Sequence, residues 1–354
     1  MFEETSLKRP LVVQVAAERT NETRPRSIQI YAEAIRSRLQ ARGVRLLDVP
    51  FEETRMLPEA DLVWAPGLGN RRVPLSLFAA GSRAVATIHG LTYLGRGPEI
   101  RELGLVHGLG HYRWRRMIRS DWKRLGPRIG AGISVSETLK PELTGLLRIP
   151  QERVRVIPHG INALFVRPSP PTSGPSIKGD YILHVCQYSR IKNLPGVLAA
   201  YQKVRNQIGL PLRIVAGGWD GDLASLAQGV EMTNTLVPQD KVRELMWGAR
   251  VFLFPSFEEP FGLPVLEAMA SGVPVVTSRG TGAGEVVGDA GLCVDPHDVD
   301  AIAAALLAAS TDKALHERLA LAGYERAKGY NWDVAADRHL ALFTQLVQQA
   351  EKGR

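Results

Sequence analysis

The sequence predicts an α/β protein of two domains, each built on a parallel sheet that helices cover. The chain has 354 residues, more than one hydrophobic core usually accommodates, so two domains are expected. Short runs of β-branched and aliphatic residues alternate with segments of helical spacing along its length. That alternation is typical of strand–helix–strand units in parallel sheets.

The first half contains six candidate strands. Between the first two, residues 28–43 have apolar side chains at helical spacing and stop at Gly43, the usual kind of C-terminal helix cap. The strands are expected at residues 11–16, 44–49, 61–65, 83–88, 129–135 and 154–157.

A run rich in proline and serine, residues 167–175, separates the halves. It can bury little apolar surface and its backbone freedom is restricted, so we expect a linker. The predicted division is an N-terminal domain at 1–167, a linker at 168–177, a C-terminal domain at 178–330 and a final helix at 331–354. Strands are expected in the second half at residues 181–187, 212–216, 251–255, 273–277 and 291–294.

The composition points to a reducing compartment. The two cysteines, Cys186 and Cys293, lie inside apolar strand-like runs, which argues against a disulfide scaffold. No apolar run reaches the roughly 18 residues that span a bilayer. Residues 1–4 provide no positively charged leader before an apolar core. We therefore expect a cytoplasmic protein.

Charge is divided unevenly between the halves. Residues 1–168 hold 27 Lys/Arg and 16 Asp/Glu, a net +11, and the remaining residues hold 17 and 20, a net −3. Within His111–Arg128, seven basic residues are interleaved with aromatic and aliphatic ones. One interpretation is a helix packed by its apolar face. The other is contact with a lipid-linked acceptor or an anionic membrane surface, which would place the protein peripherally at the inner face of the membrane.

No zinc-finger or RNA-binding signature accompanies this charge, so nucleic acid is not an expected partner. The most informative segment lies instead in the acidic half, at residues 255–276, PSFEEPFGLPVLEAMASGVPVV. A helix is expected to begin near Pro264, where proline suits the first turn, and to end at Gly272. Gly262 lets the main chain approach a ligand closely. The first helical amides would form an anion site suited to a diphosphate. They belong to Gly262, Leu263 and Val265.

Two carboxylates flank this site. Glu259 lies in the loop and Glu267 in the first helical turns, so both can point into one cleft. A carboxylate there can accept two hydrogen bonds from neighbouring hydroxyls, such as those of a ribose or a hexose. The alternative is structural, with Glu267 complementing the helix dipole and Glu259 solvated.

The string from Glu259 to Gly272 resembles the donor signature of the retaining glycosyltransferase family 4, which has the GT-B fold. This resemblance implies two Rossmann-like domains with a cleft between them, and a C-terminal helix that crosses back to the N-terminal domain. It extends to further segments in both halves. They are residues 87–90, 134–137, 156–162, 285–291 and 295–296.

The resemblance also implies roles for the donor residues. Glu259 would contact the transferred sugar, and Glu267 would bind the ribose. The main chain at Phe261, Gly262 and Leu263 would hold the diphosphate.

Three further residues gain roles in the same way. Arg190 and Lys192 follow a strand end and are similar to the basic pair of the family that stabilises the leaving diphosphate. His89, at the end of a first-domain strand, would hydrogen-bond the sugar or shield developing positive charge. Taken without the resemblance, a solvated basic loop and a structural histidine remain the alternatives.

Two departures from the family pattern concern the edges of the site. Residues 19–28 contain no glycine, where members commonly have a paired-glycine turn after the first strand, so either the acceptor side is altered or the loop is mobile. Cys186 and Gln187 replace a usual glycine–arginine pair, which leaves fewer cations for the diphosphate.

Other patterns are not assigned to chemistry. Asp298 and Asp300 mimic the metal-binding triad of a different glycosyltransferase fold, but they sit at a helix start and are interpreted as a cap. Residues 280–284 are glycine-rich, but the third glycine is one place early for a dinucleotide fingerprint. No His/Cys/Asp cluster has zinc spacing. We expect neither a metal nor another cofactor.

The sequence therefore predicts a metal-independent enzyme that moves a hexose from a nucleotide diphosphate sugar to a glycan or lipid-linked acceptor. By resemblance the anomeric configuration is retained, and general similarity suggests GDP-mannose as donor. The lack of an obvious nucleophile favours front-face attack over double displacement. The alternatives are an epimerase or phosphorylase on the same fold, and a catalytically silent protein that binds sugar nucleotides or glycans.

Overall fold

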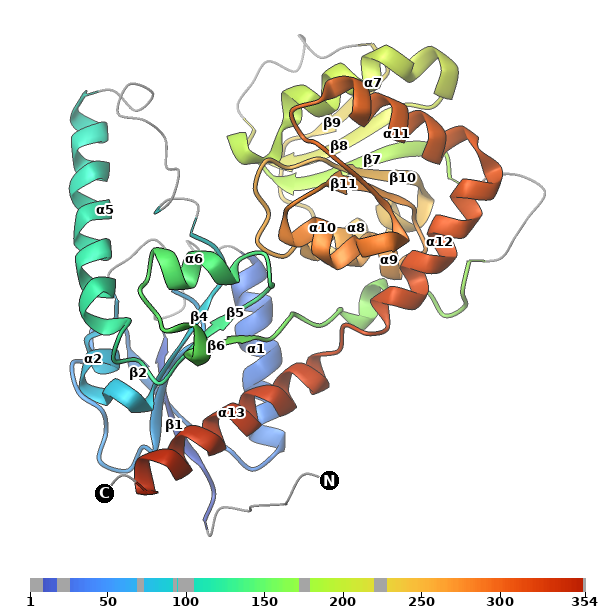
Figure 1. Cartoon of the computed structure of the whole chain (residues 1–354). Helices are drawn as coiled ribbons and strands as arrows, with labels where there is room; N and C mark the ends of the chain where they lie inside the picture. The colour runs from blue at the N-terminus through green and yellow to red at the C-terminus, as the bar shows by residue number, and fades with distance from the viewer. Residues whose placement is uncertain are drawn as a thin grey trace. The chain divides into compact units, whose positions relative to one another are not determined.

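The structure is a computed structural model that describes residues 9–17, 26–68, 73–91, 94, 105–171, 179–219 and 228–352. The chain forms two compact units (Figure 1). The first comprises Met1–His159 and Trp332–Arg354, and the second comprises Gly160–Asn331. The second unit is therefore an insertion into the chain of the first.

The boundary at residues 159 and 160 corrects the predicted division after residue 167. Residues 160–167 belong to the second unit because hydrogen bonds fix their end to it. The main-chain N–H of Arg167 donates to the carbonyl of Ala270, and its guanidinium donates to the carbonyl of Ser271. The proline-rich composition marks irregular backbone but does not report such anchoring.

The two ends of the inserted unit meet. The N–H of Ile161 donates to the carbonyl of Tyr330 over 2.9 Å, so the chain enters and leaves this unit at one point. Residues 172–178, most of the expected linker, lie outside the described residues.

The sheet of the first unit has six parallel strands in the order β2-β1-β3-β4-β5-β6. The expected strands are all present, with small shifts at their ends. Strands β3, β4 and β5 are buried at every residue, as expected of a parallel sheet covered on both faces. The strands are β1 (Val12–Ala17), β2 (Arg45–Pro50), β3 (Leu62–Ala65), β4 (Ala84–Ile88), β5 (Ala131–Ser134) and β6 (Val154–Val156).

The first helix ends as predicted. Gly43 follows it with a φ of 81°, the left-handed conformation that glycine adopts without strain. The helices described in this unit are α1 (Arg26–Ala41), α2 (Leu75–Ala80), α5 (Leu105–Leu125), α6 (Lys140–Gly145) and α13 (Trp332–Lys352), with 3-10 turns η1 (Gly81–Arg83) and η2 (Gln151–Arg153).

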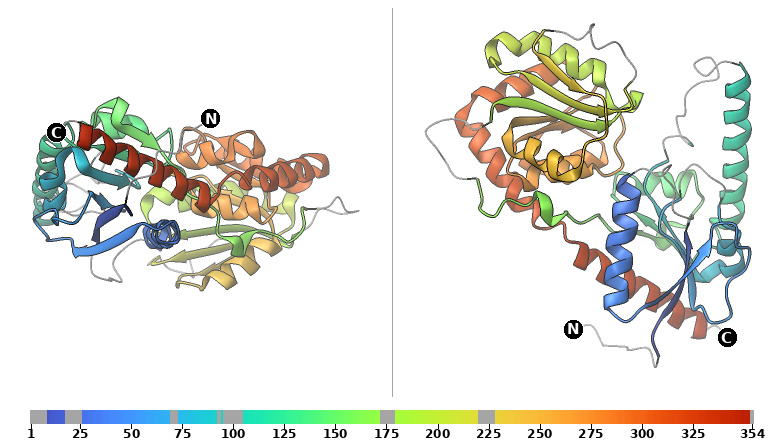
Figure 2. Two further views of the ribbon diagram at one scale, coloured as in Figure 1. Left: turned by 90° about the horizontal axis from the view of Figure 1, so that it is seen from below. Right: turned by 180° about the vertical axis from the view of Figure 1, so that it is seen from behind.

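The expected return of the C-terminal helix to the N-terminal domain is confirmed. Helix α13 lies beside α1 (Figures 1 and 2). Ala336 and Phe343 of α13 are wholly buried in the same core as Tyr31 and Ile35 of α1. The apolar face of α13 therefore completes the hydrophobic core of the first unit.

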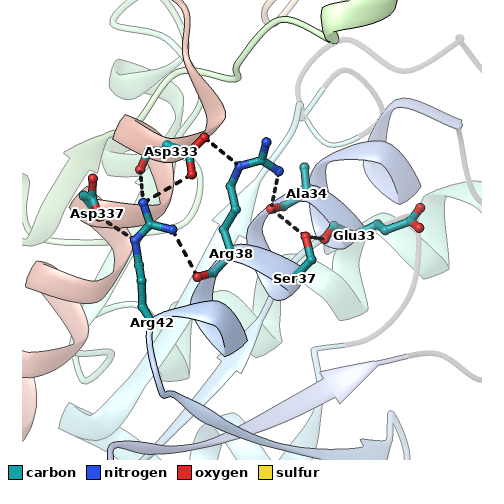
Figure 3. A network of polar contacts seen from close by, with 7 residues as sticks. All are labelled: Glu33, Ala34, Ser37, Arg38, Arg42, Asp333 and Asp337. Carbon is teal, nitrogen blue, oxygen red and sulfur yellow. Dashed lines mark hydrogen bonds and ion pairs between the residues drawn. The ribbon is translucent and has the colours of Figure 1, made fainter.

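Ion pairs join the same two helices at their rim (Figure 3). Arg42 Nε lies 2.6 Å from Asp337 Oδ1, and Arg38 Nε lies 3.3 Å from Asp333 Oδ2. Exposed ion pairs each contribute about 1 kcal/mol or less. The buried face of α13 therefore supplies most of the stabilisation, and the ion pairs orient the helix.

The sheet of the second unit has six parallel strands in the order β12-β11-β10-β7-β8-β9. Counted from β7 along the chain, this is the 3-2-1-4-5-6 order of a Rossmann sheet. Five strands match the prediction. The edge strand β9 (Val230–Thr233) was missed, because its residues alternate only between half-buried and exposed. The others are β7 (Tyr181–Gln187), β8 (Leu212–Gly217), β10 (Ala249–Phe254), β11 (Val275–Ser278) and β12 (Leu292–Val294).

Two helix interpretations in this unit are confirmed. Helix α9 is followed by Gly272 with a φ of 66°. Asp298 caps α11 by accepting the N–H of Ala301, and Asp300 pairs with Lys203 at 2.7 Å. The described helices are α7 (Leu194–Ile208), α8 (Gln239–Gly248), α9 (Leu263–Ala270), α10 (Gly282–Val287), α11 (Val299–Thr311) and α12 (Lys313–Ala327), with turns η3 (Ala163–Phe165), η4 (Arg190–Lys192) and η6 (Gly288–Ala290).

Candidate functional site

The strand order of the second sheet reverses between the neighbouring strands β7 and β10. In open parallel sheets such a switch point opens a crevice at the carboxyl ends of the strands, and ligands bind there. Residues 188–193 follow β7 and residues 255–262 follow β10. These are the two loops that the sequence pattern assigned to the donor.

An ion pair joins the two loops. Lys192 Nζ lies 2.6 Å from Glu259 Oε2, and the side chains expose only 17% and 12% of their surface. The ammonium also lies 5.2 Å from the centroid of the Phe254 ring. Removing one member of a shielded pair leaves the other charge uncompensated, so each side chain holds the other in place. The bond to Glu259 uses one of three ammonium donors.

The shape of the Glu259 loop depends on glycines. Gly262 has a φ of 96°, and a Cβ there would lie 2.9 Å from the Cβ of Ala283 and 3.5 Å from Cγ of Glu259. The N–H of Gly282 donates to the carbonyl of Glu259 over 2.7 Å. A Cβ at Gly282 would lie 2.0 Å from the carbonyl oxygen of Pro260. The glycine-rich residues 280–284 thus pack against the loop that positions the carboxylate.

Helix α9 begins at Leu263, directly after Gly262, an N-cap residue that has no side chain with which to cap the helix. The positive end of the helix dipole there favours an anion. The prediction that the amide of Val265 belongs to the anion site is wrong, because its N–H donates to the carbonyl of Gly262 over 3.0 Å within the first turn. Glu267 lies one turn further along and is 9% exposed.

The remaining donor residues differ in exposure. Arg190 opens the turn η4 and its side chain is exposed. Phe261 is buried, and its ring meets that of Tyr330 edge to face at 5.8 Å. Only the main chain of Phe261 can therefore serve a ligand. The structure brings Lys192, Glu259 and Gly262 together.

Sequence reasoning passed over Asn193, which the structure buries beside this pair. Its side chain donates to the carbonyls of Pro255 and Pro296. A signal was present, because an asparagine directly before Leu-Pro-Gly is typical of a helix N-cap with proline in the first turn.

In the first unit, His89 follows β4 at the carboxyl edge of the sheet, as predicted. Its Nε2 lies 2.9 Å from the carbonyl oxygen of Pro66, which follows β3. Its half-buried ring meets the edge of Tyr31 at 4.6 Å and lies 5.2 Å from the ring of His159. His89 is therefore held by its own unit and keeps partial access to solvent.

Tyr31 is the centre of a buried polar chain. Its hydroxyl lies 2.9 Å from Thr87 Oγ1 and 2.7 Å from His339 Nε2. Because Nδ1 of His339 lies 2.7 Å from the carbonyl oxygen of Ala335, Nδ1 carries the proton and Nε2 accepts from Tyr31. Trp64 donates to Thr87 in turn. Burial lowers the pKa of His339 to about 4, so the ring is neutral.

The basic segment His111–Arg128 lies mostly in α5, whose N-terminal half extends past the sheet of its unit (Figures 1 and 2). Ile118, Trp122 and Leu125 are buried, so the helix is packed by an apolar face. Arg115 and Arg119 donate to the carbonyl of Leu94. The opposite, exposed stripe consists of Tyr112, Arg113, Arg116, Arg119, Lys123 and Arg124.

Within the described ranges, no helix is long and apolar enough to cross a membrane. Over the same residues, no group of three or more His, Cys, Asp or Glu could hold a metal ion. The glycine-free segment 19–28 lies outside the described residues up to position 25, and residues 26–28 begin α1.

The chain has two units, each with a six-stranded parallel sheet. The second unit has a cation, a carboxylate and a helix N-terminus at the switch point of its sheet. This arrangement defines the GT-B class. Comparison with known families agrees. Residues 13–163 match the family model described as Glycosyltransferase Family 4, and residues 179–312 match Glycosyl transferases group 1. The chain belongs to this glycosyltransferase family.

Several known proteins are similar to this chain, over different shares of its length. O-antigen chain mannosyltransferase B of Escherichia coli is 35% identical over 219 residues, 57% of this chain and 57% of that protein. Sucrose-phosphate synthase of Thermosynechococcus elongatus superposes with a TM-score of 0.69 at 19% identity, over 96% of this chain and 100% of that one. Anabaena HepE, solved with UDP and glucose, gives 0.66 at 14% identity, over 95% and 100%. These structures support the fold alone.

Proposed function

We propose that the protein is a metal-independent glycosyltransferase that moves a hexose from a nucleotide diphosphate sugar to a glycan or lipid-linked acceptor, with retention of configuration. The observation that carries the proposal is the shielded Lys192–Glu259 pair, whose carboxylate lies in the loop that leads through Gly262 into the N-terminus of α9. A cation, helix amides and a carboxylate in one crevice suit a ligand that offers a diphosphate and sugar hydroxyls.

The proposed chemistry follows the charge that develops during transfer. When the bond between sugar and diphosphate breaks, the leaving oxygen gains negative charge. Lys192 stabilises that charge as a compact cation, and Arg190 can do so with a two-pronged fork. Glu259 accepts hydrogen bonds from the hexose and Glu267 from the ribose. Interactions that strengthen as charge develops lower the barrier as well as binding the donor.

Retention is explained by attack of the acceptor on the face that the diphosphate leaves, with the leaving phosphate taking the proton. Double displacement would need a carboxylate nucleophile. Glu259 is already bound to Lys192, which lowers its nucleophilicity. Because the lysine, the arginine and α9 neutralise the diphosphate, no divalent cation is required.

For the donor, similarity to O-antigen chain mannosyltransferase B favours GDP-mannose. The UDP and glucose bound by HepE make a UDP-sugar the first competitor. A thermal-shift screen over GDP-, UDP- and ADP-sugars decides between them, since free ligand at 100 times its Kd stabilises by about 2.7 kcal/mol. Absence of any nucleotide-dependent shift would overturn the donor site.

The acceptor side is proposed to lie near an anionic membrane surface. The exposed stripe of α5 presents Arg113, Arg116 and Lys123 together with Tyr112. Each basic residue close to an anionic leaflet contributes about 1 kcal/mol, and an aromatic ring suits the interface. A lipid-linked acceptor would be reached from that position.

One measurement separates the transferase from the other members of its fold. The purified protein, given the donor found by the screen, should hydrolyse it slowly to nucleoside diphosphate and free sugar. Binding without hydrolysis or transfer would favour a catalytically silent binder. Conversion to a different nucleotide sugar would favour an epimerase.

A further inference from the structure

We infer that Asn193 is a positioning residue that holds Lys192 and Glu259 at their working separation. The inference rests on the proposed function, because it concerns the charges assigned to the donor diphosphate and sugar. Asn193 itself is only 3% exposed and is not offered as a ligand of the donor.

The side chain of Asn193 hydrogen-bonds within the protein through both its NH2 group and its carbonyl oxygen. Its Nδ2 donates to the carbonyl of Pro255 over 3.0 Å and to that of Pro296 over 2.8 Å. Its Oδ1 accepts the N–H of Gly196 over 3.2 Å. An amide offers two donors and one carbonyl, so each N–H has an acceptor and the carbonyl has a donor.

These bonds tie together three loops that follow three different strands. Asn193 ends the loop after β7 and is covalently next to Lys192. Pro255 opens the loop after β10 that leads to Glu259, and Pro296 follows β12. One asparagine therefore links the segments that carry the cation and the carboxylate to a third segment at the same edge of the sheet.

Two further contacts close the arrangement. The N–H of Phe257 donates to the carbonyl of Ile191 over 2.8 Å. The ring of Phe257 stacks on that of His297 at 4.7 Å. Each pair of loops is thus joined directly, and a shift of one loop must disturb contacts to the other two.

The backbone at this position restricts which residue can do this. Asn193 has a φ of 54° and a ψ of 39°, and it is one of two described non-glycine residues with positive φ, Arg148 being the other. Asparagine tolerates this left-handed conformation better than most residues. Glycine would accept the same backbone and make none of the bridges. A Cβ at Gly196 would lie 2.5 Å from Oδ1 of Asn193, so that position must also stay small.

The experiment uses Asn193→Gly in the full chain with the donor identified by the screen. This variant keeps the backbone conformation and removes the bridges. Misplaced electrostatic groups cost more in the transition state than in the ground state. We therefore expect kcat to fall about tenfold or more while the donor KM changes less than about threefold. Gly196→Ala, which drives a methyl group into the Asn193 amide, should give the same pattern if Asn193→Gly does not fold.

A matched control removes a helix cap elsewhere in the second unit. Asp312 caps α12 by accepting the N–H of Leu315 over 3.0 Å. Asp312→Ala should lower the melting temperature and leave kcat unchanged below it. A purely structural Asn193 would behave like this control, and that result would overturn the inference.

A double-mutant cycle identifies the group through which Asn193 acts. In a Lys192→Ala background, Asn193→Gly should lower kcat by less than about twofold, because groups that act as a unit are not additive. Additive losses would overturn the positioning role. If Lys192→Ala alone keeps full activity, the proposed donor site fails. If Lys192→Ala loses activity and Asn193→Gly does not, the inference alone fails.

Discussion

The hydroxyl of Tyr31 donates to Nε2 of His339 over 2.7 Å, although 308 residues separate them along the chain. Both side chains are wholly buried. This bond joins α1 to α13 inside the core, whereas the ion pair of Arg42 with Asp337 joins the two segments at the exposed rim (Figure 3). It requires a neutral His339, because a protonated ring would have no lone pair to accept.

The first prediction follows from that requirement. Burial lowers the pKa of His339, and also that of His184 in β7, to about 4, below the ordinary value of about 6.5. The unfolded chain then binds protons that the folded chain cannot. The stability from neutral histidines is complete above about pH 6.5 and is lost as the pH falls toward about 4. Each histidine contributes up to about 3 kcal/mol.

The measurement is calorimetric unfolding between about pH 7.5 and about pH 5. His339→Gln should reduce the pH dependence of the first unit only, because His184 lies in the second unit; part of the dependence should remain, since burial also lowers the pKa of His159 in the first unit. A transition of the first unit that keeps its full pH dependence in His339→Gln would contradict this assignment.

The second prediction concerns the donor pair. Glu259→Gln and Lys192→Met should each lower kcat by about a hundredfold or more, the scale of losing one electrostatic stabiliser. Each single variant should also unfold more easily, because it leaves a shielded charge without its partner. The double variant should recover stability without recovering activity. Steady-state kinetics and urea unfolding measure the two effects.

The control for the pair is Lys203→Ala, which breaks the exposed ion pair with Asp300. It should leave kcat unchanged and change the free energy of unfolding by no more than about 1 kcal/mol. Near-normal turnover in a folded Glu259→Gln protein would remove Glu259 from the proposed mechanism.

The third prediction concerns metal. Lys192, Arg190 and α9 are proposed to neutralise the diphosphate, so activity should survive EDTA after passage through a chelating resin. Asp298 and Asp300 already act as a helix cap and as a partner of Lys203. Loss of activity with EDTA, restored by manganese or magnesium, would point to a metal site formed with the substrate.

The fourth prediction concerns α5. Arg113, Arg116 and Lys123 are exposed. Of the other basic residues on α5, Arg115 and Arg119 donate to the Leu94 carbonyl and Arg124 lies over the Phe78 ring, so reversing the first three leaves these contacts in place. Changing all three to Glu should abolish co-sedimentation with vesicles containing anionic lipid. Wild-type binding should weaken at high salt.

The matched control reverses three exposed basic residues elsewhere, namely Arg318, Arg338 and Lys352. It has the same net charge as the α5 variant and should still bind. Equal losses in both variants would mean that overall charge, and not α5, determines membrane binding. Binding that ignores lipid charge, salt and both sets of substitutions would leave α5 as a packed helix with a solvated side.

The strands and the donor loop could be predicted because their signals are local. A buried parallel strand is a continuous apolar run, and Pro264 and Gly272 mark the ends of α9 by their own backbone preferences. The edge strand β9 could not be predicted in this way. It has no buried residue, so no apolar pattern marks it.

Long-range contacts explain the other differences. The domain boundary depends on bonds from Arg167 to carbonyls about a hundred residues later, which no composition reveals. The return of α13 was implied by family resemblance, but His339 as the acceptor for Tyr31 was not. The sequence beside Asn193 marks a helix N-cap, but its bridges could not be predicted, because Pro255 and Pro296 are distant in sequence.

The bond between Ile161 and Tyr330 has a consequence for synthesis on the ribosome. All strands and helices of the second unit precede α13 in the chain, so the sequence of this unit is complete before α13 is translated. The core of the first unit is completed later, because Tyr31 and Trp64 pack in one core with residues of α13, which follows the second unit in the chain. Domains usually complete in N-to-C order. Here the sequence of the inserted unit is complete before that of the first unit, whose early strands need α13 to complete their core.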